Sequence, residues 1–160
     1  MINKTKWRDE QQFSKKIVYH LKNLGYMVNR IEPNAAAGAT IGMPDLMIVS
    51  PRGGVRLIEL KCIEKPKNEP RDYYQITKDT QTRFSLKDSQ LLKFYEFKQF
   101  CLPVWILVAE KGTANMAVTN YGLIQKKQSQ IFMQYSTDYK EVFRIMGIYE
   151  DVVDQWKTNF

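Results

Sequence analysis

Cysteine and histidine are scarce in this chain of 160 residues, which contains two cysteines and one histidine. Neither Cys62 nor Cys101 has metal-ligand spacing with another cysteine or with His20, and this argues against a zinc site. Both cysteines are expected to be free, buried thiols. His20 falls on the apolar stripe of a predicted helix, which is typical of a partly buried structural histidine rather than a general base.

Long hydrophobic runs are also absent. No stretch approaches the ~20 apolar residues of a membrane span, and the opening MINKTKWRDEQQF lacks the apolar core of a signal peptide. We therefore expect a cytoplasmic protein with no membrane partner. Internal repeats and low-complexity tracts are missing as well, so residues 1–160 are predicted to form one domain with its own core.

Positive charge is plentiful, with a formal net charge of +7 and a pI of about 9.3. A basic chain is compatible with nucleic acid, with anionic lipid or with simple solubility. Charge alone therefore does not select a partner.

Hydrophobic periodicity predicts an α/β protein. Apolar residues at steps of four, four and three make residues 8–26 a helix that Gly25 ends. A second helix is predicted over 85–100, beginning at Ser85 or Lys87, and a third over about 138–156. Strands are predicted over 26–32, 45–50, 55–62, 103–110 and 115–121. The core order helix–strand–strand–strand–helix–strand indicates a central mixed sheet flanked by helices.

Three charged residues interrupt the two strands that are joined by the turn PRGG. Side chains alternate along a strand, so Glu59 and Lys61 share one face, and hairpin pairing brings Asp45 close to Glu59. Two adjacent carboxylates repel and are costly to desolvate. A hard divalent cation removes that repulsion, and Mg²⁺ commonly takes one or two carboxylates and keeps its waters. The pattern therefore predicts a divalent-metal site with an ammonium beside it.

The stretch PDLMIVSPRGGVRLIELK, residues 44–61, resembles the signature of the PD-(D/E)XK nuclease superfamily. The surrounding order is similar to the VRR-NUC branch and, more loosely, to archaeal Holliday junction resolvases. It has a helix with Glu10 near its start, a loop of small residues before Pro44-Asp45, and a later helix with Gln90 followed by PVWILVAE. The similarity covers about residues 9–110 and implies a restriction-endonuclease-like core. Residues of about 121–160 form an extension without a counterpart.

The resemblance implies a role for each residue of the central motif. Asp45 and Glu59 would be metal ligands, the backbone carbonyl of Leu60 a third, and Lys61 the group that orients water or stabilises developing charge. Each also has an ordinary alternative. Asp45 could make local hydrogen bonds at a strand entry, and Glu59 and Lys61 could simply pair with each other on an edge strand.

Glu10 and Gln90 are added by the same resemblance. Glu10 would complete the acidic cluster, through water or a second metal, and Gln90 would steady Lys61 or contact the nucleic-acid backbone. The alternatives are a favourable helix-dipole position for Glu10 and a solvated surface position for Gln90.

A long polar segment, 63–83, follows the strand that carries Glu59, and it is longer than in compact VRR-NUC modules. It is interpreted as a surface for phosphates and unpaired bases, or else as a solvated loop with its own acids. The candidate nucleic-acid-binding residues are Lys65, Lys67, Arg71, Tyr73, Tyr74 and Lys78.

Taken together, the sequence predicts a Mg²⁺- or Mn²⁺-dependent enzyme that hydrolyses phosphodiester bonds in DNA, an endonuclease that could be structure-selective and, by analogy, a homodimer. The alternatives are a non-cleaving nucleic-acid-binding module on the same fold and a small-molecule hydrolase on an unrelated α/β fold. A binder has no need of a repelling carboxylate pair, which favours the nuclease.

Overall fold

The computed structural model describes residues 6–31, 42–64, 86–121 and 138–148 of the chain. In these ranges the elements are α1 (Glu10–Asn23), β1 (Met27–Arg30), β2 (Leu46–Val49), β3 (Val55–Ile63), α3 (Asp88–Gln99), β4 (Val104–Glu110), β5 (Met116–Asn120) and α5 (Tyr139–Ile145). The predicted order of helices and strands is confirmed. Within these ranges, no helix has both the length and the apolar character that a membrane crossing requires.

The opening helix forms as its periodicity predicts. Asp9 caps α1 by accepting a hydrogen bond from the Gln12 amide at 2.7 Å, which satisfies one of the free N–H groups of the first turn. Phe13, Ile17 and Leu21 are fully buried along one stripe. Just beyond the C-cap residue Leu24, Gly25 adopts φ 84°, a left-handed conformation that reverses the chain into β1.

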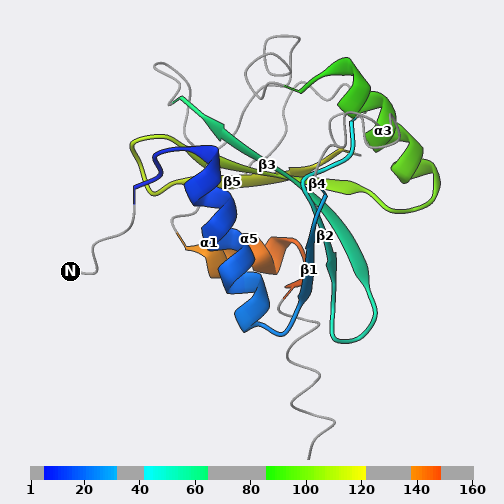
Figure 1. Ribbon diagram of the computed structural model, residues 1–160, viewed down its shortest axis with the longest axis horizontal. Helices are drawn as coiled ribbons and strands as arrows, with labels where there is room; N and C mark the ends of the chain where they lie inside the picture. Colours follow the sequence, from blue (N-terminus) through cyan, green and yellow to red (C-terminus); the bar gives the residue numbers. More distant parts are fainter. Residues whose placement is uncertain (1–5, 32–41, 65–85, 122–137, 149–160) are drawn as a thin grey trace, which may run out of the picture.

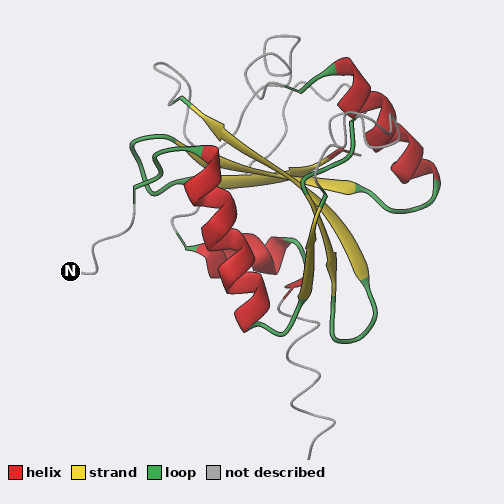
Figure 2. Ribbon diagram, viewed as in Figure 1, coloured by secondary structure: helices red, strands yellow, loops and turns green. Residues whose placement is uncertain are grey.

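The five strands form one mixed sheet in the order β1-β2-β3-β4-β5 (Figure 1). Only the β3–β4 pair is parallel, and α3 lies on the crossover that parallel strands require. The helices α1 and α5 cover one face of the sheet and α3 the other, as the colouring by secondary structure makes clear (Figure 2). The predicted central mixed sheet flanked by helices is confirmed.

Each face of the sheet has its own hydrophobic cluster. Ile58 and Leu60 of β3 belong to the cluster under α1 and α5, whereas Leu57 belongs to the cluster under α3. The predicted alternation along β3 is therefore confirmed, and Glu59 points toward α3. Phe94 is the only residue of α3 that is fully buried, and Leu91 and Phe97 pack, partly buried, against the same cluster.

The strand β3 extends well beyond its neighbour β2. The antiparallel register joins Leu46 to Ile58 and ends there, whereas pairing with β4 continues to Ile63. From Glu59 onward, no strand of the described ranges covers the backbone edge of β3 on the β2 side. This half-paired edge locates the candidate site.

The C-terminal part differs from the predicted helix over 138–156. The helix α5 ends at its C-cap Met146, and Gly147 follows at φ 73°, a turn that a continuous helix does not allow. The residues from 149 onward lie outside the described ranges. Arg56 Nε donates a hydrogen bond to the Met146 carbonyl at 2.9 Å, which ties this turn to β3.

The single histidine and the two cysteines can be placed in the fold. His20 is partly buried and stacks on Tyr139 with ring centroids 3.7 Å apart, as expected for a structural histidine. The prediction of two buried thiols is wrong, because Cys62 is only half-buried and Cys101 is exposed. Cys101 occupies the turn after α3 at φ 57°, where the chain must leave the helix before β4 begins.

Candidate active site

Asp45 stands at the point where β2 stops covering β3. Its carboxylate Oδ2 accepts a hydrogen bond from the backbone N–H of Leu60 at 2.7 Å, so a side chain takes the place of a strand partner. Its own carbonyl accepts from the N–H of Ile31 at 2.8 Å, which holds the residue to the end of β1. The register also places Asp45 next to Glu59, the proximity that hairpin pairing predicted.

Glu59 is almost completely buried, with 1 % of its surface exposed. One carboxylate oxygen, Oε1, accepts from Lys61 Nζ at 2.7 Å and from Gln90 Nε2 at 2.6 Å. The other oxygen, Oε2, is buried and has no hydrogen-bond donor within the described part of the chain. Leaving such an oxygen without a donor is costly, so this oxygen calls for a proton or a cation.

Burial and mutual repulsion raise the pKa values of this carboxylate pair. Burial, followed by repulsion from Asp45, raises the pKa of Glu59 to about 7, although Lys61 and Gln90 oppose the rise. Burial also raises the pKa of Asp45, and the Leu60 amide, the charge of Lys61 and a side-chain hydrogen bond with Glu59 oppose the rise. A carboxyl poised near neutrality in a buried pair is a feature of functional sites.

The helix α3 holds Gln90 in a fixed orientation. Gln90 Oε1 accepts from the backbone N–H of Lys87, the N-cap residue, at 3.0 Å, and its Nε2 is directed at Glu59. The resemblance assigned Gln90 to Lys61 or to nucleic acid. In the structure Gln90 contacts the same carboxylate oxygen as Lys61 does, so it acts on Glu59.

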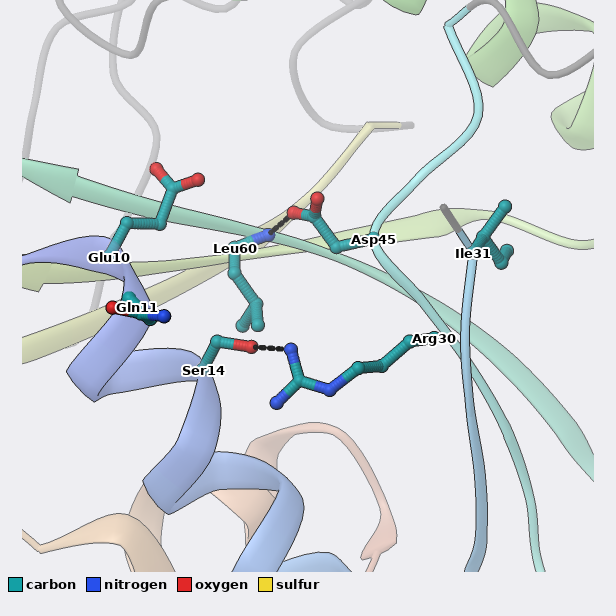
Figure 3. Close-up of a pocket in the computed structure, with 7 residues that line it drawn as sticks. All are labelled: Glu10, Gln11, Ser14, Arg30, Ile31, Asp45 and Leu60. Carbon is teal, nitrogen blue, oxygen red and sulfur yellow. Dashed lines mark hydrogen bonds between the residues drawn. The ribbon is translucent and has the colours of Figure 1, made fainter. Parts of the chain in front are cut away.

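On the opposite face of the sheet, a pocket of about 300 Å³ opens beside β3 (Figure 3). Its lining residues come from α1, β1, the turn before β2, and β3, and they are Glu10, Gln11, Ser14, Arg30, Ile31, Asp45 and Leu60. In Figure 3 the Asp45 carboxylate lies directly against the Leu60 backbone, and Glu10 projects from the start of α1. The first turn of α1 and the free edge of β3 therefore meet at this pocket.

Glu10 is held by the same edge of β3. Partial burial raises its pKa, opposed by Lys61 and by a hydrogen bond from the Cys62 backbone, while the charge of Asp45 adds to the rise. The N–H and C=O of one strand residue point to the same side. The Leu60 N–H binds Asp45, so the Leu60 carbonyl is directed toward the same edge. It lies between the Leu60 N–H that Asp45 contacts and the Cys62 backbone that Glu10 contacts.

Sequence reasoning missed Arg30. This residue ends β1 and reaches across the pocket, where its Nη1 donates to Ser14 Oγ on α1 at 2.8 Å (Figure 3). Its charge also lowers the pKa of Asp45, though other influences on that carboxyl are larger. A strand-end arginine carries no signal in the sequence. Only the meeting of β1 with α1 reveals that it faces the acids.

The acids do not form a ready-made metal cluster. In the ranges that the structure describes, no three histidine, cysteine, aspartate or glutamate side chains lie together in a metal-binding arrangement. What the site offers is a carboxylate pair and the edge of β3. The six candidate nucleic-acid-binding residues of the segment 63–83, Lys65 to Lys78, lie outside the described ranges.

Comparisons with known proteins give structural neighbours only. No protein-family model matches the chain, and no curated protein matches it. A Holliday junction resolvase, Hjc, from Archaeoglobus fulgidus is similar at 13 % identity and a TM-score of 0.46, over 76 % of this chain and 87 % of its own. A VRR_NUC domain is similar at 18 % identity and a TM-score of 0.42, over 75 % of this chain and 94 % of its own. These are the two groups that the sequence resemblance names.

Proposed function

We propose that the protein is a nuclease that hydrolyses phosphodiester bonds in DNA with the help of Mg²⁺ or Mn²⁺. The observation that carries the proposal is the buried Glu59 carboxylate, which lies beside Asp45 and has one oxygen without a hydrogen-bond donor among the described residues. A fold gains no stability from two repelling buried acids, so the pair indicates a cation that both carboxylates bind.

The donor set fits a hard divalent cation. Asp45 and Glu59 would supply carboxylate oxygens and Leu60 its backbone carbonyl, all oxygen ligands of the type that Mg²⁺ and Mn²⁺ prefer. Glu10 would join through water, since it stands at the far end of the same edge. When bound, the cation polarises a phosphodiester and lowers the pKa of a bound water. This set, with two direct carboxylates, agrees with the lack of a three-acid cluster in the described ranges.

The remaining polar groups would act on the substrate and on the ligands. Lys61, 13 % exposed and paired with Glu59, would present its ammonium to the water or to the charge that develops on the phosphorus oxygens. Arg30, at the pocket wall, would anchor a phosphate through guanidinium N–H groups other than the one given to Ser14. Gln90 would fix the Glu59 carboxylate, as its two hydrogen bonds indicate.

A cleavage panel tests the proposal. Linear, nicked, flapped, four-way and supercoiled DNA, together with RNA, would be incubated with Mg²⁺, with Mn²⁺ and with EDTA. We expect DNA cleavage that EDTA abolishes, and the panel reports whether one DNA structure is preferred. Binding without cleavage of any substrate would favour the non-cleaving module instead. Sedimentation of the same preparation tests the predicted homodimer.

A further inference from the structure

Gly42 lies against the first turn of α3 at a distance that only glycine allows. A Cβ built on Gly42 would stand 2.2 Å from the Ser89 carbonyl oxygen, 2.6 Å from the Ser89 carbonyl carbon and 3.0 Å from the Gln90 nitrogen. All three atoms belong to backbone, so no side-chain rotation relieves the overlap. Gly42 also adopts φ 81°, a conformation that glycine reaches without strain.

This contact joins the turn that carries Asp45 to the helix that carries Gln90, the hydrogen-bond partner of Glu59. Gly42 begins the turn that carries Asp45 three residues later, and Asp45 accepts the Leu60 N–H. On the other side of the contact, Gln90 donates to Glu59 at 2.6 Å. The turn and the helix start thus meet backbone to backbone, next to the residues that hold the pair.

The contact at Gly42 adds to the side-chain packing that places α3 on the sheet. Phe94 is the only fully buried residue of the helix, and it lies one turn beyond Gln90. Leu91 and Phe97 pack, partly buried, against the same cluster, and the backbone contact at Ser89 adds a close fit at the first turn.

We infer that Gly42 is a positioning residue, whose bare backbone lets the Asp45 turn seat on α3 and sets Gln90 at bonding distance from Glu59. The inference rests on the proposed function only where cleavage is measured. A methyl group at Gly42 must push the helix start away by about 1 Å to reach ordinary van der Waals separation. The Gln90–Glu59 hydrogen bond then exceeds the distance at which it holds.

The test compares Gly42→Ala with Gly53→Ala. Gly53, in the β2–β3 turn, has φ 90° but no atom of a described residue within 4 Å of a built Cβ, so alanine there suffers similar backbone strain without the overlap. The readout is the side-chain amide signal of Gln90 in nitrogen-15 spectra of the metal-free protein, assigned by its disappearance in Gln90→Ala. Single-turnover cleavage in Mg²⁺ is measured in parallel.

In Gly42→Ala we expect the Gln90 amide protons to shift toward values for exposed glutamine and to exchange about tenfold faster or more. Cleavage should fall at least about tenfold, since displacements of about 1 Å cost that much or more. Gly53→Ala should leave both within about twofold. Unchanged Gln90 signals in Gly42→Ala, or equal changes in Gly53→Ala, overturn the inference. The amide readout decides even if the wild type cleaves nothing.

If Gly42→Ala does not fold, the inference is tested on the wild-type protein instead. A nuclear Overhauser contact between the Gly42 Hα protons and the Gln90 backbone N–H, together with slow exchange of the Gln90 side-chain amide, supports the inference. Absence of that contact overturns it.

Discussion

The buried charge of Glu59 should make the metal-free protein less stable as the pH rises. The pKa of Glu59 lies at about 7 in the folded protein, against an ordinary value of 4.5, so the folded state retains a proton that the unfolded state releases. A group whose pKa is raised by folding contributes stability that is complete below pH 4.5 and is lost as the pH rises through 7. Glu59→Gln removes the charge, keeps the shape, and should abolish this loss.

The size of the effect follows from the two pKa values. The gap from 4.5 to about 7, at about 1.4 kcal/mol per pH unit, corresponds to at most about 3.5 kcal/mol. Asp45 shares the same repulsion, so we expect about 1–3 kcal/mol for Glu59 alone. Glu59→Gln should therefore be more stable than the wild type by this amount at pH 8 in EDTA, and about equal to it at pH 4.5.

Urea unfolding followed by circular dichroism at pH 4.5 and pH 8, with EDTA, measures this difference. Glu96→Gln is the matched control, because the same chemical change there affects an exposed ion pair with Lys93 and should matter little at either pH. Adding Mn²⁺ at pH 8 should stabilise the wild type and leave Glu59→Gln unchanged, because ligand binding to the folded state alone raises stability. A Glu59→Gln variant less stable than the wild type at pH 8 would refute the reasoning, because Lys61 and Gln90 would then outweigh the cost of burial.

Three further results are expected. Asp45→Ala should abolish cleavage and keep the fold, and the double variant with Glu59→Ala should lose its calorimetric Mn²⁺ signal; full activity in Asp45→Ala would contradict the site. Lys61→Ala should still bind Mn²⁺ and DNA, while its single-turnover rate falls by about 10²-fold; a loss of affinity at an unchanged rate would make Lys61 a phosphate anchor. Replacing Lys67 and Arg71 by alanine should reduce the slope of log affinity against log salt by about one per residue, and an unchanged slope would place recognition elsewhere.

The fold and the centre of the site could be predicted because local signals agree with each other. The stripe of Phe13, Ile17 and Leu21 specifies α1, and the alternation around Glu59 specifies which side chains of β3 face α3. The turn PRGG then fixes the register that brings Asp45 to Glu59. Each of these inferences uses spacing over a few residues, where the backbone geometry leaves little choice.

Other features depend on contacts between distant elements, which spacing does not encode. Arg30 reaches the acids only because β1 ends opposite α1. Gln90 contacts Glu59 only because the first turn of α3 lies over that part of β3. The predicted helix over 138–156 forms over Tyr139–Ile145 and is interrupted by the left-handed turn at Gly147, while the residues from 149 onward lie outside the described ranges. The exposure of Cys101 likewise follows from its place in a turn, where an apolar residue need not be buried.

The pair Pro44-Asp45 explains how a carboxylate comes to lie against the backbone of β3. If the register that joins Leu46 to Ile58 continued, the next hydrogen-bonded partner of Leu60 would be Pro44. Proline has no N–H, so it cannot pair with the Leu60 carbonyl, and the ladder ends. Asp45 then supplies by its side chain the acceptor that the Leu60 N–H needs, and the Leu60 carbonyl remains directed at the open edge. Pro44 thus ends a strand, exposes a backbone carbonyl and leaves a carboxylate beside it, and this is the gap in which we propose the cation.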